Sequence, residues 1–120
     1  MKEMLVQLGK RAKDAEAALR TISTDKKNQV LAAVADHLVK NSEALLKANE
    51  EDVKNGKANH MPEGLVDRLL LTRERIEGRA DGLRQLVDLE DPVGEVTGMK
   101  KRPNGLLIGQ KREPLGVTGI

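Results

Sequence analysis

The character of the chain changes at Pro92, and this change limits the folds it can adopt. Before Pro92, apolar residues recur every three or four positions, which is the spacing of one face of a helix. After Pro92, six Gly and two Pro lie among short β-prone runs. The sequence therefore predicts an α+β chain, with helices over residues 1–91 and extended structure over 93–120.

The first part divides into five expected helices, the first over residues 1–20. Thr and Asn side chains accept hydrogen bonds from the free amides of a first helical turn. The expected N-caps are Thr24, Asn41 and Thr72. Pro62 is expected to open a short fourth helix, and Pro92 disfavours helix at the residue before it. The positions expected to face inward are Val30, Leu31, Val34 and Leu38, then Leu65, Leu69 and Leu70, then Ile76, Ala80, Leu83, Leu86 and Val87.

The second part is expected to form a basic hairpin over residues 93–113, with arms Val96–Arg102 and Leu106–Arg112. Its turn is Pro103-Asn104-Gly105, which combines a fixed φ with a residue that tolerates positive φ. Residues 114–120 end in Leu115-Gly116-Val117-Thr118-Gly119-Ile120, which is apolar on both faces, as a buried parallel strand would be. A buried strand at the end of the sequence suggests a truncated sheet.

The chain has no Phe, Tyr, Trp or Cys. A core must therefore be built from aliphatic residues and Met, which suits packed helices and disfavours modules that stack bases on aromatic rings. Without Cys there is no disulfide, thiolate metal site or Cys nucleophile. No apolar run is long enough for a signal peptide or a membrane span, so a cytoplasmic protein is expected.

Basic residues gather after Pro92, where five Lys or Arg stand against two Glu, although the net charge of the whole chain is only +2. A charge run is more often a solvated face than a nucleic-acid contact. We therefore expect no nucleic-acid partner, although a basic hairpin that binds nucleic acid stays open as an alternative.

The candidate chemical residues are few. His37 and His60 lie on different expected elements without a third ligand, so a metal site is not predicted; a half-buried helical position is favoured for His37 and a loop for His60. The acidic run at 50–52 favours solvation, because neighbours on a helix point in different directions. Asp67 and Arg68 stand among leucines. They either line the polar edge of a helix and make tertiary contacts, or Arg68 anchors a phosphate or carboxylate.

The glycines do not form a phosphate-binding loop, since neither a G-x-G-x-x-G nor a P-loop pattern is present. From the residues alone we therefore assign no catalytic, cofactor-binding or metal-binding residue. What they establish is a helical region, a basic hairpin and a last strand, without a reaction.

Four motifs in order carry a resemblance to a known family. They are Leu45-Leu46-Lys47-Ala48-Asn49 with Asp52-Val53, then Gly64-Leu65 with Asp67-Arg68-Leu69-Leu70-Leu71-Thr72, then Asp91-Pro92-Val93-Gly94-Glu95-Val96, then Lys111-Arg112-Glu113-Pro114-Leu115-Gly116-Val117. Together they make the chain resemble the N-terminal segment of glutamyl-phosphate reductase (glutamate-5-semialdehyde dehydrogenase), in the aldehyde dehydrogenase superfamily.

The resemblance implies an enzyme that uses NADPH to reduce L-glutamyl 5-phosphate to glutamate 5-semialdehyde in proline biosynthesis. It implies that the catalytic Cys and the Rossmann-like cofactor sheet lie beyond residue 120, so that the isolated chain binds no cofactor and is inactive. It also implies that the 93–113 hairpin pairs with a second subunit. The alternative is a free-standing helical interaction module, which would bury Leu106–Ile108 within its own chain.

Overall fold

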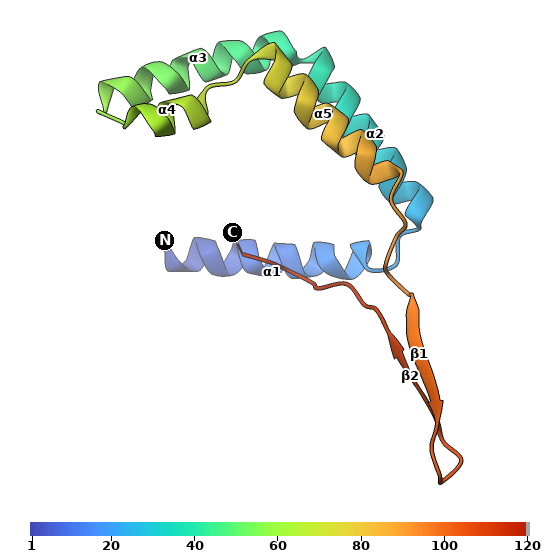
Figure 1. The fold of residues 1–120 in the computed structure, drawn as a ribbon. Helices are drawn as coiled ribbons and strands as arrows, with labels where there is room; N and C mark the ends of the chain where they lie inside the picture. Colours follow the sequence, from blue (N-terminus) through green and yellow to red (C-terminus); the bar gives the residue numbers. More distant parts are fainter. Residues whose placement is uncertain (120) are drawn as a thin grey trace. The chain divides into compact units, whose positions relative to one another are not determined.

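In the computed structural model, which describes residues 1–119, five helices precede a two-stranded antiparallel sheet (Figure 1). The elements are α1 (Lys2–Leu19), α2 (Thr24–Lys40), α3 (Ser42–Ala58), α4 (Glu63–Leu69), α5 (Arg73–Val87), β1 (Val96–Lys101) and β2 (Leu107–Lys111). All five helices precede Pro92 and both strands follow it, which confirms the predicted change of structure. From residue 93 to residue 119 there is no helix.

The chain forms two compact units. Unit 1 comprises Met1–Thr24 and the residues from Glu90 onward, and unit 2 comprises Asp25–Leu89. Unit 1 thus holds α1 and the hairpin, and unit 2 holds nearly all of α2 together with α3, α4 and α5. The division of the sequence into 1–91, 93–113 and 114–120 stays a prediction.

The buried residues of unit 2 come from α2, α3 and α5, and α2 and α5 run side by side (Figure 1). Ala35 of α2 and Ala80 of α5 are fully buried, and Ile76 of α5 is only 2% exposed. Ile76 is the largest fully buried side chain of the described residues, and burying such a side chain stabilises a fold by roughly 1.5–3 kcal/mol. Ile76 and Ala80 were predicted to face inward, whereas Ala35 was not.

Part of the predicted inward stripe is exposed. Val30 and Val34 are 49% and 44% exposed, and Leu65, Leu70 and Leu86 are also exposed. The physical reason is the small number of covering elements, because a single helix, α5, runs beside α2 (Figure 1). Helical spacing identified the apolar face but not how much of it has a neighbour.

Asn49 of α3 clamps the connection between α4 and α5. Its Nδ2 donates to the carbonyl of Leu69 at 2.8 Å, and its Oδ1 accepts from the amide of Leu71 at 2.7 Å. The side chain is 6% exposed, so both bonds are made largely away from water. This geometry fixes the point where α4 ends. Among the described residues, Ser42 on the same helix is the other buried polar residue.

The C-terminus of α3 closes in a Schellman turn. The amide of Met61 donates to the carbonyl of Gly56 at 3.0 Å, and the amide of His60 donates to that of Lys57 at 3.1 Å. His60 has a φ of 56°, in the left-handed region that usually takes glycine. Gly56 is buried under Met61, and a Cβ on Gly56 would lie 3.3 Å from the Met61 sulfur. His60 is therefore a turn residue, as predicted.

The three expected caps have different outcomes. Thr72 caps α5 as predicted, because its Oγ1 accepts from the amide of Arg75 at 3.1 Å. Asn41 stands at the N-cap of α3 without a side-chain cap bond, and its Nδ2 instead donates back to the carbonyl of His37 at 2.8 Å. Thr24 is the first residue of α2, and its hydroxyl donates to the Asp91 carboxylate at 2.9 Å. Asp91 therefore joins the start of α2 to the segment that leads into the hairpin.

The hairpin of unit 1 forms where it was predicted. Its pairs run from Val96 with Lys111 to Lys101 with Leu107, and a bulge interrupts the register between Val96 and Gly98. Gly105 has a φ of 89°, as the predicted turn requires, and Asn104 Oδ1 accepts from the amide of Leu106 at 3.2 Å. Each arm is one residue shorter at the turn than predicted, and β2 also ends one residue earlier.

The predicted strand at 114–120 is not confirmed. Residues 112–119 form no strand, and Leu115 is fully exposed. A parallel strand needs neighbouring strands to satisfy its backbone, and the described chain offers only the short hairpin. The tail instead runs along α1, where a Cβ on Gly116 would lie 4.0 Å from Glu16 Cδ (Figure 1). Ile120 lies outside the described residues.

Candidate functional site

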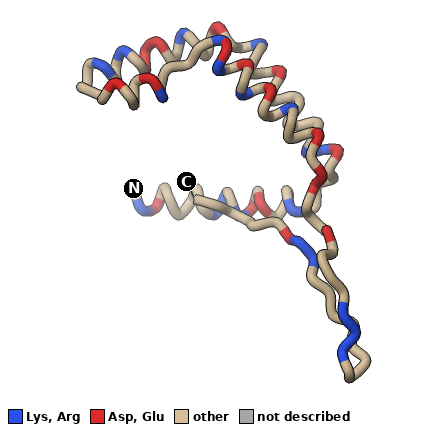
Figure 2. Tube along the Cα trace, in the orientation of Figure 1, with Lys and Arg blue, Asp and Glu red and all other residues tan. Residues whose placement is uncertain are grey.

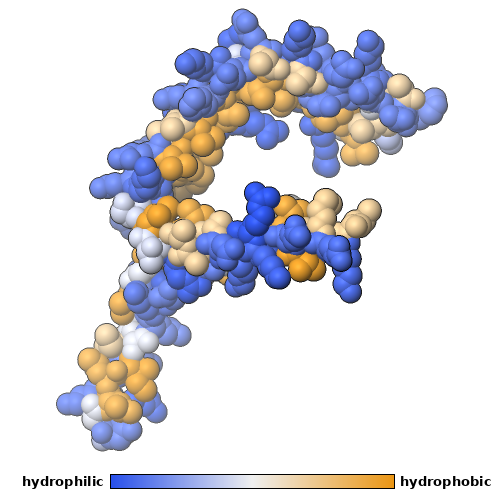
Figure 3. Space-filling model, turned by 180° about the vertical axis from the view of Figure 1, so that it is seen from behind, coloured by the Kyte–Doolittle hydropathy of each residue, from blue (hydrophilic) through white to orange (hydrophobic). Residues whose placement is uncertain are grey.

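The hairpin exposes apolar and basic side chains together. Every residue of β1 and β2 is exposed, including Met99, Leu107 and Ile108. Figure 3 shows apolar side chains gathered over the hairpin, and Figure 2 shows the run of Lys and Arg in β1 and the turn. Met99 lies over Gly109, where an added Cβ would come within 2.9 Å of the Met99 sulfur. A two-stranded hairpin is at best marginally stable in water, so this surface needs a cover.

A second surface lies at the turn between α4 and α5. Its lining residues are Asp67, Arg68, Leu70, Arg75, Gly78 and Arg79. The Arg75 guanidinium lies at the centre of the contacts. Its Nη2 donates to both carboxylate oxygens of Asp67 at 3.1 and 3.2 Å, and its Nη1 donates to the carbonyls of Leu70, at 2.8 Å, and of Asp67. Arg75 thus holds the end of α4 against the first turn of α5.

Asp67 and Arg68 differ in their contacts, although they are adjacent in the sequence. Asp67 makes the tertiary contact that one interpretation of the sequence predicted, through its ion pair with Arg75. The side chain of Arg68 has no hydrogen bond or ion pair among residues 1–119, and that of Arg79 on α5 has none either. We call the surface that these residues line the basic hollow. It holds three arginines and a single carboxylate.

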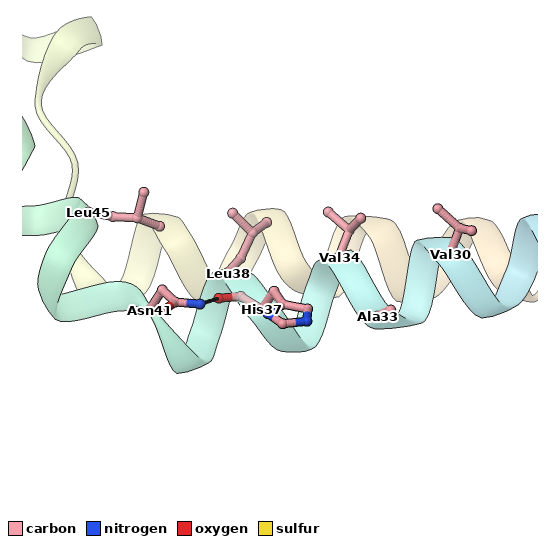
Figure 4. A pocket seen from close by; sticks show the side chains of 7 residues that line it. All are labelled: Val30, Ala33, Val34, His37, Leu38, Asn41 and Leu45. Carbon is pink, nitrogen blue, oxygen red and sulfur yellow. Dashed lines mark hydrogen bonds between the residues drawn. The ribbon is translucent and has the colours of Figure 1, made fainter. Parts of the chain in front are cut away.

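A third surface is an apolar shallow hollow along α2 and the start of α3 (Figure 4). Val30, Val34, Leu38 and Leu45 stand in a row along one side of it, and His37 and Asn41 lie on the other (Figure 4). His37 is exposed, so the predicted half-buried position is wrong. The reason is that α5 covers the Ala35 side of α2 and leaves His37 in solvent.

Neither histidine takes part in a metal-binding group. Within the described part of the chain, no three His, Cys, Asp or Glu side chains lie close enough together to hold a metal ion. The acidic run Glu50-Glu51-Asp52 is exposed on α3. Over residues 1–119, none of the helices combines the length and apolar character that crossing a membrane requires.

Solved structures define the class of protein that this fold resembles. The chain superposes on γ-glutamyl phosphate reductase from Thermotoga maritima with a TM-score of 0.84 and 34% identity, covering 92% of this chain and 27% of that one. The corresponding values for γ-glutamyl phosphate reductase from Saccharomyces cerevisiae are 0.83 and 31%, covering 90% of this chain and 28% of that one. The α+β arrangement is thus that of an N-terminal part of these reductase structures.

Curated relatives agree with the structures. The γ-glutamyl phosphate reductase of Lachnospira eligens is 57% identical over 118 residues, which cover 98% of this chain and 28% of the relative. That of Halothermothrix orenii is 49% identical over 120 residues, which cover the whole chain and 29% of the relative. No family model matches the chain.

The chain therefore spans somewhat more than a quarter of the length of the curated relatives it matches. Its similarity to an N-terminal segment of γ-glutamyl phosphate reductase, predicted from four motifs, is confirmed over nearly every residue. The motifs have visible structural tasks. Asn49 forms the clamp, Asp67 binds Arg75, and Asp91 receives the Thr24 hydroxyl.

Proposed function

We propose that this chain is the N-terminal segment of a reductase that converts L-glutamyl 5-phosphate into glutamate 5-semialdehyde in the cytoplasm, as a step of proline biosynthesis. The observation that carries the proposal is the 57% identity over 118 residues to a protein named γ-glutamyl phosphate reductase. The bound NADPH would supply the hydride. No residue of the present chain is assigned to that transfer.

The role of this segment is to support the rest of the enzyme. Unit 2 offers a small core of its own and an apolar row in which Val30 and Val34 are exposed and Leu38 is half-buried. Burial of such side chains stabilises an interface by roughly 25 cal/mol per Å² of apolar area removed from water. We therefore propose that the helices pack on the cofactor domain and that residues 114–120 begin its Rossmann-like sheet.

The hairpin is proposed to pair with a second subunit. Its exposed apolar side chains and its two open strand edges are features that favour strand pairing with another chain. The basic residues Lys100, Lys101 and Arg102 repel a like-charged neighbour, but salt screens this repulsion beyond about 8–10 Å. Apolar burial then outweighs the repulsion in an assembled enzyme.

The alternative of a free-standing helical module requires the hairpin to be buried within its own chain. Leu106, Leu107 and Ile108 are 58%, 65% and 55% exposed, which does not meet that requirement. The alternative of a nucleic-acid-binding hairpin has only the basic run in its favour. It would be indicated by binding that falls steeply as salt rises.

The test of the proposed function is a chimera. Residues 1–120 of this chain replace the matching segment of the Lachnospira eligens protein, and the reaction is followed in reverse, as phosphate-dependent reduction of NADP⁺ by glutamate 5-semialdehyde. We expect turnover within about tenfold of the unmodified relative. The isolated 120-residue chain should show none.

A matched control is the relative with its own segment deleted, which should be inactive. A folded, soluble chimera without activity would contradict the assignment of this segment to such an enzyme. Turnover by the isolated chain above a no-protein blank would contradict its proposed inactivity.

A further inference from the structure

We propose that the basic hollow at the α4–α5 turn binds a phosphate group, free or as a monoester, through Arg68 and Arg79. This inference goes beyond the reductase function and does not depend on it. It rests on residues that unit 2 holds by itself, namely Asp67, Arg68, Arg75 and Arg79 with Gly78 between them.

The charges of the hollow do not cancel. Among residues 1–119, Asp67 is the only acidic residue that lines it, and both of its carboxylate oxygens accept from the Arg75 guanidinium. That ion pair leaves Arg68 and Arg79 as two guanidinium groups with no hydrogen bond or ion pair in the described chain. The hollow therefore carries an excess of two positive charges.

The hollow is shaped before any ligand enters. Arg75 is fixed by four donated hydrogen bonds to Asp67 and Leu70, and it ties the last turn of α4 to the first turn of α5. Arg68 comes from α4, and Arg79 lies one turn after Arg75 on α5, so the two unpaired arginines come from different helices. Gly78 also lines the hollow, and a Cβ added there would meet nothing within 4 Å. The absence of a side chain there leaves room for an oxyanion.

Phosphate fits this charge better than a carboxylate does. A phosphomonoester carries about −1.5 to −2 charges at neutral pH, against −1 for a carboxylate, and so matches two unpaired guanidinium groups. Each guanidinium is planar and presents parallel N–H donors that match the spacing of phosphate oxygens. Three terminal oxygens allow arginines from two helices to bind one phosphate at once.

The experiment is a titration of the ¹⁵N-labelled 120-residue chain with inorganic phosphate at constant ionic strength, followed through the amides of Gly78 and Arg79 and the Arg68 Nε–H. We expect saturable shifts at these groups. Arg68→Gln and Arg79→Gln should each weaken the affinity by roughly tenfold, because each removes a charge-assisted contact. Both side chains are exposed, so the fold should persist. Arg68→Lys, which keeps the charge, should lose less.

The matched control is Arg11→Gln, which removes the same charge from exposed α1 in unit 1 and should leave the affinity unchanged. Glycerol phosphate and acetate, titrated in the same way, separate the sources: glycerol phosphate should bind at least as well as inorganic phosphate, and acetate more weakly. Shifts that stay linear in phosphate, that chloride reproduces, or that survive both the Arg68 and the Arg79 substitution would overturn the proposal. The titration measures phosphate binding by residues of unit 2 and the chimera assay measures turnover, so a failure of one does not imply a failure of the other.

Discussion

Unit 2 and the hairpin of unit 1 solve the problem of stability in opposite ways. In unit 2, Ile76 and Ala80 are buried, and both polar groups of the Asn49 side chain form hydrogen bonds with the backbone. In the hairpin, every residue of both strands is exposed, although its backbone pairing and turn are regular. The comparison teaches that correct local structure and sufficient burial are separate requirements, and that this chain meets both only in unit 2.

The same substitution made in unit 2 and in the hairpin should have very different effects on stability. Ile76→Ala should lower the free energy of unfolding by about 2–4 kcal/mol, because it removes a buried side chain and leaves a cavity. Ile108→Ala removes the same atoms from a side chain that is 55% exposed and should cost below about 1 kcal/mol. Urea unfolding followed by circular dichroism measures both. Equal losses of unfolding free energy would show that Ile108 in the hairpin is buried to the same degree as Ile76.

Asn49→Ala tests the polar half of the unit 2 core. It leaves the carbonyl of Leu69 and the amide of Leu71 without their partner in a site that is largely out of water, at a cost of about 2–3 kcal/mol. Asn59→Ala is the matched control, since Asn59 Nδ2 makes a single exposed bond to the carbonyl of Asn55. Its cost in urea unfolding should stay below about 1 kcal/mol. A similar cost for both variants would contradict a special contribution of the Asn49 hydrogen bonds to the stability of unit 2.

His60→Gly should stabilise unit 2 by up to about 1 kcal/mol, because His60 occupies a left-handed position that glycine adopts without strain. His60→Ala keeps the strain and serves as the control, with a change near zero. Thermal unfolding of the two variants checks the difference. A destabilised His60→Gly would mean that the imidazole makes a contact that outweighs the backbone strain.

The smallest expected effect lies in unit 1, on α1. The hydrogen bond from Arg20 to Glu16 holds the pKa of the Glu16 carboxyl below its usual value. A lowered pKa in the folded state stabilises above the unfolded pKa, and this contribution is lost as pH falls through the folded pKa. An NMR titration should find a low midpoint for Glu16 that Arg20→Gln raises and Arg11→Gln does not. An unchanged Glu16 midpoint in Arg20→Gln would show that Arg20 is not the cause of the lowered pKa.

Most of the fold could be predicted from the sequence, because its signals are local. Apolar spacing, the Thr72 cap and the Pro103-Asn104-Gly105 turn act within a few residues, and each gave the element that the structure has. Burial was harder to predict from the sequence, because it depends on which distant part of the chain packs against each residue. Val34 and Ala35 are adjacent on α2, yet Ala35 is fully buried and Val34 is 44% exposed.

The candidate site could be predicted only in part, for the same reason. The Asp67-Arg68 pair stood out among leucines, but its division into a bound Asp67 and an unpaired Arg68 depends on Arg75, eight residues from Asp67. The two hydrogen bonds of the Asn49 side chain reach Leu69 and Leu71, and Leu71 is more than twenty residues away in the sequence. Motif likeness indicated that Asn49 matches the family pattern, whereas only the structure shows that it binds the backbone of Leu69 and Leu71.

The central claim is that unit 2 is stabilised by its own core, whereas the hairpin depends on surfaces outside this chain. Amide hydrogen exchange tests it directly, measured on the 120-residue chain at low micromolar concentration and on the chimera with the Lachnospira eligens protein. We expect the amides around Ile76 in α5 to exchange slowly in both. Those of β1 and β2 should exchange rapidly in the chain alone and slow by at least about a hundredfold in the chimera. Equal protection of the hairpin in both proteins would contradict the account.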